Sequence, residues 1–281
     1  MSADTISMRD ALYEAPGPKT RRRIVIGTVI ASIALVALVA AVAWRFYITG
    51  QFAPQYWEFF TKWSTWNYLL SGLLGTFEVA LTAGAIALVL GVVFMLGRIS
   101  KNKVVSTIFR IVIDFFRGVP SLLLIYFFFL VIPAYGIKMS SFWMLALPIS
   151  LTASGVLAEV FRAGVNAVPA GQREAALSIG MSEGKVMRKI ILPQAVRFVI
   201  PSLISQLVVV VKDTTVAYVV SYPDMLQNAR VLITNYDALV STYFVVAIIY
   251  ILINFAINQA SIYVARRSGT RVISRNQEDP V

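Results

Sequence analysis

Residues 159–194 read EVFRAGVNAVPAGQREAALSIGMSEGKVMRKIILPQ and form a polar segment between two long apolar stretches of the chain. Within this polar segment, Pro169 and Gly171 predict a turn, and residues 172–179 are rich in helix-forming side chains. Gly180 stands where a helix commonly ends in a left-handed residue, and we expect Pro193 to end a second helical piece. The sequence therefore predicts a short helix-turn-helix that lies outside the membrane.

The composition is that of an integral membrane protein. Of the 281 residues, 58% are hydrophobic and 14% are charged, which is too much apolar surface for one soluble core. The chain has no cysteine and no histidine, so disulfides, cysteine or histidine catalysis and the usual zinc sites are excluded. We expect a chain that is not an enzyme and holds no metal, with an all-α fold, a polytopic transmembrane helix bundle.

Six apolar stretches are candidates to cross a membrane at about 1.5 Å per helical residue. The first is too long for the apolar core of a cleavable signal peptide, so a retained span is preferred. Gly118 and Pro120 break the helix over residues 104–116, and the short third span is expected to borrow residues before Gly118. The expected spans are residues 24–48, 68–96, 121–133, 142–161, 195–211 and 239–264, flanked by tails of residues 1–23 and 266–281.

The second span carries glycines that would let helices approach closely, namely Gly72, Gly75, Gly84 and Gly91.

The positive charges fall in alternate loops. Of the 25 Lys and Arg residues, 20 lie before the first span, in residues 98–117, in residues 162–197 or after residue 265. Three others, Lys62, Lys138 and Arg230, lie in the opposite set of loops. The positive-inside rule then predicts that both termini and the polar segment are cytoplasmic. The net charge of +11 is accordingly assigned to membrane lipid headgroups, with no nucleic acid as a partner.

The spacing within the polar segment resembles the coupling loop of the inner-membrane permease subunits of ABC importers. It consists of Glu174-Ala175-Ala176, three residues, Gly180, nine residues, and then Ile-x-Leu-Pro at residues 190–193. FFRGVP at residues 115–120 and KDTTVAYVVSYPDML at residues 212–226 resemble the polar amino acid branch, the histidine, glutamine and glutamate type, of the binding-protein-dependent permeases. The resemblance covers residues 66–265 and implies a five-span permease core preceded by one additional transmembrane helix.

The resemblance also implies partners. These are a dimer of ATP-binding cassette ATPase subunits, a second permease subunit that is a copy of this chain or a similar one, and an extracytoplasmic substrate-binding protein. Residues 180–186 are one residue short of a phosphate loop and lack its hydroxyl, so the partner ATPase is expected to bind ATP and Mg, with no cofactor in this chain. The expected contacts with the ATPase come from Glu174, Ala175, Ala176, Gly180, Met181 and Ser182. Near a helix start, Glu174 would pair with a basic group on the partner or cap its own helix.

Charged residues inside spans are costly and therefore point to function. Glu159 and Arg162, three residues apart, are expected to form a local pair. The residues after Lys212 are poor helix formers, so we expect the helix to break there and to border the substrate path, with two threonine hydroxyls supplying hydrogen bonds. A structural ion pair of Lys212 with Asp213 is the alternative. The candidate residues of the substrate path are Glu78, Lys212, Asp213, Thr214 and Thr215.

The expected function is that of a permease subunit that moves a polar amino acid, with a lean toward glutamate or glutamine, by alternating access driven by separate ATPase subunits. Two alternatives stay open. A secondary transporter or pore would use Glu78 or Asp213 as a titrating group, although no internal repeat supports an inverted-repeat transporter. A membrane-embedded enzyme would need convergent acids, bases or metal ligands, and the spans hold only scattered carboxylates.

Overall fold

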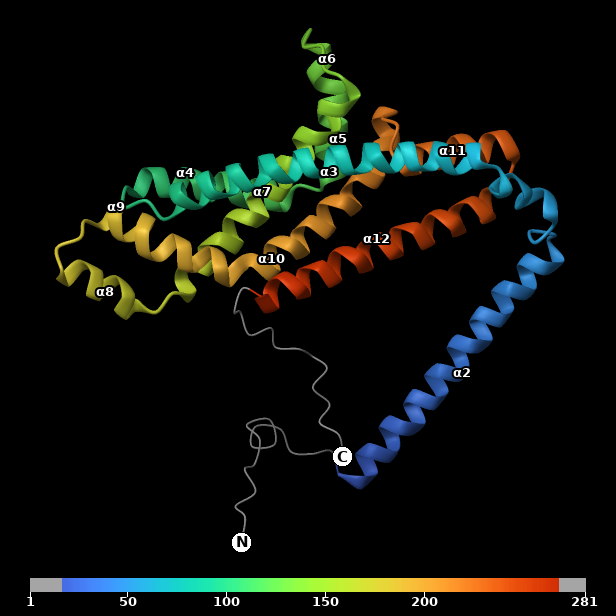
Figure 1. Cartoon of the computed structure of the whole chain (residues 1–281), viewed down its shortest axis with the longest axis horizontal. Helices are drawn as coiled ribbons and strands as arrows, with labels where there is room; N and C mark the ends of the chain where they lie inside the picture. The colour runs from blue at the N-terminus through green and yellow to red at the C-terminus, as the bar shows by residue number, and fades with distance from the viewer. Residues whose placement is uncertain (1–16, 268–281) are drawn as a thin grey trace. The chain divides into compact units, whose positions relative to one another are not determined.

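The computed structural model describes residues 17–267, and these residues form helices joined by turns (Figure 1). The chain divides into two compact units, one that ends at Trp57 and one that begins at Glu58. The first unit contains α2 (Pro18–Ile48) and the short 3-10 turn η1 (Pro54–Tyr56). Because α2 begins at Pro18, four of the basic residues that the sequence places before the first span, Lys19 and Arg21 to Arg23, belong to its first turns. The remainder of the predicted tails, residues 1–16 and 268–281, lies outside the described residues.

The second unit is a bundle of long helices with shorter pieces between them. Figure 1 shows α3, α7, α10 and α12 running side by side, and contacts join each neighbouring pair. The elements are η2 (Glu58–Thr61), α3 (Trp63–Arg98), α4 (Lys103–Gly118), α5 (Ser121–Tyr126), η3 (Phe127–Val131), α6 (Ile132–Ala134), α7 (Ser141–Ala167), α8 (Ala170–Ser178), α9 (Glu183–Val186), η4 (Met187–Ile191), α10 (Leu192–Asp213), η5 (Thr214–Val220), α11 (Met225–Tyr236) and α12 (Leu239–Arg267).

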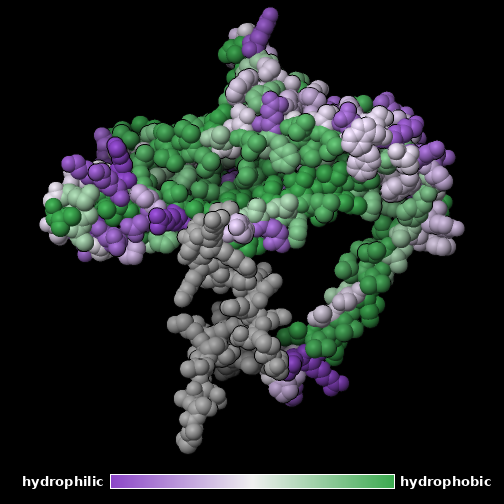
Figure 2. Space-filling view, viewed as in Figure 1, coloured by the Kyte–Doolittle hydropathy of each residue, from purple (hydrophilic) through white to green (hydrophobic). Residues whose placement is uncertain are grey.

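Among the described residues, five helices are long and apolar enough to cross a membrane, and one bent pair would make a sixth. Their most apolar windows have mean hydropathy between 1.7 and 2.8. Figure 2 shows hydrophobic side chains along the long helices of the second unit and hydrophilic ones at α8 and α9 and near α11. The all-α fold class with five to six spans is confirmed. The five candidates are Pro18–Ile48, Trp63–Arg98, Ser141–Ala167, Glu183–Val220 and Leu239–Ala260.

The third predicted span is the bent pair. The helices Lys103–Gly118 and Ser121–Ala134 meet at 97°. Val119 is extended, as a residue before proline tends to be, and Pro120 is the N-cap of α5. The expectation that residues before Gly118 lengthen this span stays a prediction: it holds where the bent pair is one broken span, with a near right-angle bend between α4 and α5 (Figure 1).

Pro193 does not end a helix, which corrects the expectation stated above. It lies in the first turn of α10, directly after the π turn η4, and residues 183–220 are helical throughout. Proline is tolerated in the first turn of a helix, because the N–H groups there have no intrahelical carbonyl to bond. The preceding wide π turn accommodates the missing hydrogen bond. The side-chain amide of Gln194 also donates to the Ile190 carbonyl at 3.0 Å. The polar segment is therefore joined to the following span by one helical path.

Helix α11 has no counterpart in the sequence expectation. Its start is fixed by Asp224, whose Oδ1 accepts a hydrogen bond from the Gln227 N–H at 2.7 Å. An acidic N-cap followed three residues later by glutamine is a helix-start signal that the sequence offered. This short polar helix was not predicted, because a hydropathy window as long as a membrane span does not detect it.

Glycines set how closely α3 meets its neighbours. A Cβ at Gly72 or Gly75 would lie 2.7 or 2.6 Å from an atom of residues 223–228, and one at Gly91 would lie 2.8 Å from Leu157 of α7. The predicted close approach is confirmed at these three positions. At Gly84 the nearest atom would be at 3.5 Å, an ordinary contact, so Gly84 is not required for close packing.

We expect Gly75→Ala to destabilise the protein by about 1–3 kcal/mol, because the added methyl group meets the rigid carbonyl of Pro223. The measurement is thermal unfolding of the purified protein in detergent. Gly84→Ala, on the same helix and in an uncrowded place, is the matched control and should not lower the midpoint, because alanine favours a helix by about 1 kcal/mol over glycine. Equal losses in the two variants would contradict the close approach of α3 to the residues before α11.

Candidate functional site

The polar segment folds into a hairpin-like projection at one end of the second unit, formed by α8, a turn and α9 (Figure 1). One terminal nitrogen of Arg173 on α8 donates to both oxygens of Glu183 at the start of α9, at 2.8 and 2.9 Å. Lys101, in the turn between α3 and α4, lies 3.3 Å from the same carboxylate. The Glu183 carboxylate raises the pKa of the Arg173 guanidinium. Three segments of the chain are thus tied together at one acidic side chain.

The turn between α8 and α9 is set by Gly180, whose φ is +82°. The Gly180 N–H bonds to the Leu177 carbonyl at 2.9 Å, and the Met181 N–H bonds to the Ala176 carbonyl at 3.2 Å. These two bonds are those of a Schellman motif, which uses a left-handed residue to satisfy the last carbonyls of a helix. The predicted helix cap at Gly180 is confirmed, and a Cβ there would meet no atom within 4 Å.

Ala176 faces inward. It is buried in a small cluster that also contains Val168, Val186, Ile191 and Ala195. The expectation that Ala176 contacts a partner directly is corrected on this point, because its side chain packs against the rest of the polar segment and α10. Its methyl group holds α8 in place, while Ala175 is exposed and Met181 is half-buried.

Glu174 is the fifth residue of α8, and the first turn of α8 contains no acidic residue. Its side chain is exposed and makes no hydrogen bond or ion pair with the rest of the described chain. The alternative that Glu174 caps its own helix is therefore wrong, since only the first turn leaves N–H groups for a cap. The carboxylate is free for another chain.

Ile179 is a candidate that the sequence analysis missed. It follows the last turn of α8, next to Gly180, and is 79% exposed. Leu177 of α8 is also exposed, at 37%, and apolar side chains that are exposed together can form a contact surface. The available signal was an isoleucine among polar residues directly before a predicted helix cap.

The other predicted group lies toward the opposite end of the bundle. Glu78 of α3 accepts a hydrogen bond from the Tyr222 hydroxyl at 3.1 Å. Burial and the Glu78 carboxylate raise the pKa of Tyr222 to about 12. Nearby, burial raises the pKa of the Asp224 carboxyl to about 6, partly offset by the Gln227 N–H. The structure thus links Glu78 to the residues that precede α11.

The α-helix ends at Asp213, as predicted, but the chain keeps helical dihedrals and continues as the 3-10 helix η5 until Ser221, which is left-handed with φ 51°. The Thr214 hydroxyl donates to the Val211 carbonyl at 2.8 Å, and the Thr215 hydroxyl donates to the Lys212 carbonyl at 2.7 Å. Thr214 is fully buried. Both hydroxyl protons are therefore used within the helix, contrary to the expectation that they are offered to a ligand.

Lys212 is exposed and Asp213 is half-buried. Within residues 17–267 neither side chain takes part in an ion pair, so the alternative of a structural Lys212–Asp213 pair is not realised. By contrast, the predicted pair of Glu159 and Arg162 is confirmed, with 2.7 Å between Glu159 Oε2 and Arg162 Nη2.

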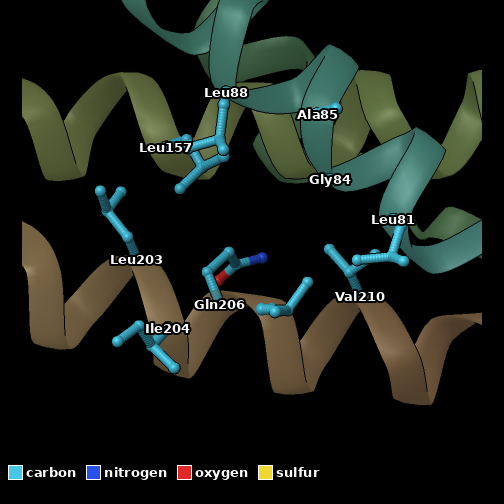
Figure 3. A pocket seen from close by; sticks show the side chains of 10 residues that line it. Leu81, Gly84, Ala85, Leu88, Leu157, Leu203, Ile204, Gln206 and Val210 are labelled. Atoms are coloured by element: carbon cyan, nitrogen blue, oxygen red, sulfur yellow. The ribbon is translucent and has the colours of Figure 1, made fainter. Parts of the chain in front are cut away.

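An apolar cavity of about 330 Å³ lies between α3, α7 and α10 (Figure 3). Gln206 supplies its one polar side chain, and none of the five predicted path residues lines it. A charged or zwitterionic ligand would find a single amide in this cavity, so its lining suits an apolar group. The lining residues are Leu81, Gly84, Ala85, Leu88, Leu157, Leu203, Ile204, Gln206, Leu207 and Val210.

Known proteins resemble this chain in sequence and in structure. Residues 87–269 match the family profile described as the binding-protein-dependent transport system inner membrane component. The glutamate transport system permease protein GluD of Corynebacterium glutamicum is 32% identical over 240 residues, which cover 82% of this chain and 88% of that protein. The probable glutamine ABC transporter permease protein GlnP of Bacillus subtilis is 31% identical over 204 residues, or 73% of this chain and 93% of that protein.

A solved structure described as an amino acid ABC transporter with histidines superposes with a TM-score of 0.70 at 25% identity. The superposition covers 74% of this chain and 98% of that chain. The family match over residues 87–269 includes the polar segment and the residues before α11.

Proposed function

Because this chain belongs to the family of inner membrane components of binding-protein-dependent transport systems, we propose that it is the permease subunit through which an ABC importer moves glutamate or glutamine. The chain is a multi-pass protein of the inner membrane and an ABC transporter permease, and ATP is bound and hydrolysed by partner ATPase subunits. The lean toward glutamate or glutamine rests on the two relatives named above. A second permease subunit and an extracytoplasmic substrate-binding protein complete the proposed assembly.

The observation that carries the proposal is the shape of the polar segment. A separate ATPase can drive a membrane domain only through a rigid projection that transmits its movement. The Arg173–Glu183 bonds, the helix cap at Gly180 and the buried Ala176 make α8 such a projection. Its attachment to α10 through the π turn η4 supplies a path along which a movement of α8 tilts a span.

Contact with the ATPase is proposed for the exposed part of this projection. Glu174 offers an unpaired carboxylate, Ile179 offers an apolar anchor, and Ala175 and Gly180 leave room for close approach. Met181 and Ser182 continue the same surface. Ala176 acts by positioning α8.

Gly180→Leu should detach or uncouple the ATPase, because the side chain costs about 1 kcal/mol at a positive φ and fills the space that a partner would enter. The measurements are co-purification of the ATPase subunit and substrate-stimulated ATP hydrolysis in the reconstituted complex. Glu174→Ala should reduce co-purification and hydrolysis less, since it removes one contact with the ATPase without filling the space between the two subunits.

Gly171→Leu is the matched control, because Gly171 lies exposed on α8, the helix that Gly180 caps, without a positive φ and with no atom within 4 Å of its Cβ position. It should leave co-purification and hydrolysis unchanged. If Gly180→Leu inserts, keeps the ATPase and retains full stimulated hydrolysis, the projection is not the coupling element.

We further propose that both termini and the polar segment are cytoplasmic, on the basis of the 20 positive residues on that side. The chain has no native cysteine, so single cysteines can be introduced without a background. A membrane-impermeant maleimide added to intact cells should label Ser140→Cys, which is exposed before α7. It should not label Ser2→Cys, Ser178→Cys or Ser274→Cys, and labelling of any of these three from outside would reverse the topology.

The substrate path is proposed to pass the region where α10 gives way to η5. In this region Lys212 is exposed, and Asp213 and Thr215 are half-buried. Glu78 is connected to the same region through Tyr222. Thr214 would act by holding the change from α-helix to 3-10 helix. A helix that changes type inside a membrane is tolerated where it lines a cavity or is packed in protein.

Asp213→Asn should lower transport by about tenfold, the cost of one charge-assisted hydrogen bond, while the ATPase still co-purifies. Uptake of labelled glutamate, glutamine, arginine and histidine by the reconstituted complex measures this effect and identifies the substrate. Asp237→Asn, which makes the same change at an exposed site after α11, is the control. Normal transport by Asp213→Asn would remove this residue from the path. Uptake driven by an ion gradient without ATP would favour the secondary transporter instead.

A further inference from the structure

A polar hollow of about 340 Å³ has no part in the function proposed above. It lies where the end of α3, the first half of α4 and the end of α7 meet. Lys101, between α3 and α4, contacts Glu183 of α9, so the hollow opens at the same end of the bundle as α8. Its lining consists of Arg98, Ile99, Ser106, Thr107, Arg110, Arg162 and Asn166.

The three guanidinium groups that line this hollow outnumber the carboxylates beside them. Glu159 faces two of them, with 2.7 Å to Arg162 Nη2 and 3.5 Å to Arg98 Nε. Arg110 approaches Asp114 at 3.7 Å, and Asp114 also lies 4.0 Å from Arg117. Four arginines thus face two carboxylates, which leaves an excess of positive charge.

The geometry leaves nitrogens free for another anion. Arg98 and Arg110 each approach their carboxylate through Nε. A guanidinium carries five N–H donors, so the terminal nitrogens of both side chains remain available. The Thr107 hydroxyl and the Asn166 amide add neutral donors at the rim, since both side chains are exposed.

One guanidinium group can bond two phosphate oxygens at once. Basic pockets between transmembrane helices commonly hold anionic headgroups. The adjoining face of α4 exposes Val104, Ile108 and Ile111 at 67, 54 and 64%. Lipid acyl chains would cover these side chains while a headgroup lies in the hollow.

We propose that this hollow is a binding site for a phosphate group, supplied by an anionic phospholipid headgroup or by a free phosphate. The site goes beyond the transport function, and only its placement at the cytoplasmic surface rests on the topology proposed above. Arg98 and Arg162 form the inner wall, and Arg110 closes the site from α4.

The test measures phosphatidylglycerol binding to the purified full chain in detergent by native mass spectrometry, with phosphatidylcholine as the neutral comparison. Arg110→Gln should weaken phosphatidylglycerol binding about tenfold, the effect of losing one charge-assisted bond. Asp114→Asn should strengthen it, because it removes a competing carboxylate. Arg197→Gln removes an exposed positive charge of α10 outside the hollow and should leave binding unchanged.

Added inorganic phosphate separates the two sources. Displacement of the lipid by phosphate at millimolar concentration identifies a free phosphate site, and retention of the lipid identifies a headgroup site. The proposal is overturned if Arg110→Gln binds phosphatidylglycerol as the unchanged chain does, or if Arg197→Gln weakens binding equally. Because the assay needs neither ATPase nor transport, its result is independent of the coupling experiment.

Discussion

Hydrocarbon offers no hydrogen-bond partner, so each backbone N–H and C=O inside the membrane must be satisfied by the chain itself. The helical character of the apolar spans follows from this constraint. It also dictates where irregular backbone is allowed. The π turn η4 lies in the polar segment, and the 3-10 helix η5 packs against α3, α7 and α10. At the latter, Thr214 and Thr215 bond carbonyls of their own helix. The features with functional interest thus occur where packing or solvent compensates for a departure from the α-helix.

Close helix contact is the second condition of the fold, and it depends on small residues. Gly72 and Gly75 admit the residues around Asp224, and Gly91 admits α7. This contact places Tyr222 within hydrogen-bond distance of Glu78, which would otherwise be an isolated carboxylate on a spanning helix. An intramembrane charge is expensive unless it has such a partner. The connection gives Glu78, which is exposed on α3, one hydrogen-bond partner.

The polar segment combines rigidity with exposure, which is what an energy-coupling element needs. Its rigidity comes from the helix cap at Gly180, from the buried Ala176 and from the Glu183 carboxylate that Arg173 and Lys101 share. Its exposed surface carries Glu174 and Ile179. In the polar hollow where α3, α4 and α7 meet, the arginines outnumber the carboxylates, which leaves positive charge for a ligand.

The sequence by itself determined the helical membrane class, the approximate positions of the five long apolar helices and the helix cap at Gly180, because hydropathy, length and the conformational freedom of glycine act locally. It also determined the Glu159–Arg162 pair, since three residues separate them on one helix. Only the tertiary structure decided that Ala176 faces inward, that Pro193 continues a helix, that the third span is bent by 97° and that Tyr222 bonds Glu78. The burial of Ala176 and the Tyr222–Glu78 bond depend on which distant segments meet, and a local pattern of residues carries no record of the neighbour that lies across the bundle. The helix through Pro193 and the bend before Pro120 depend on backbone dihedrals that a proline permits but does not fix.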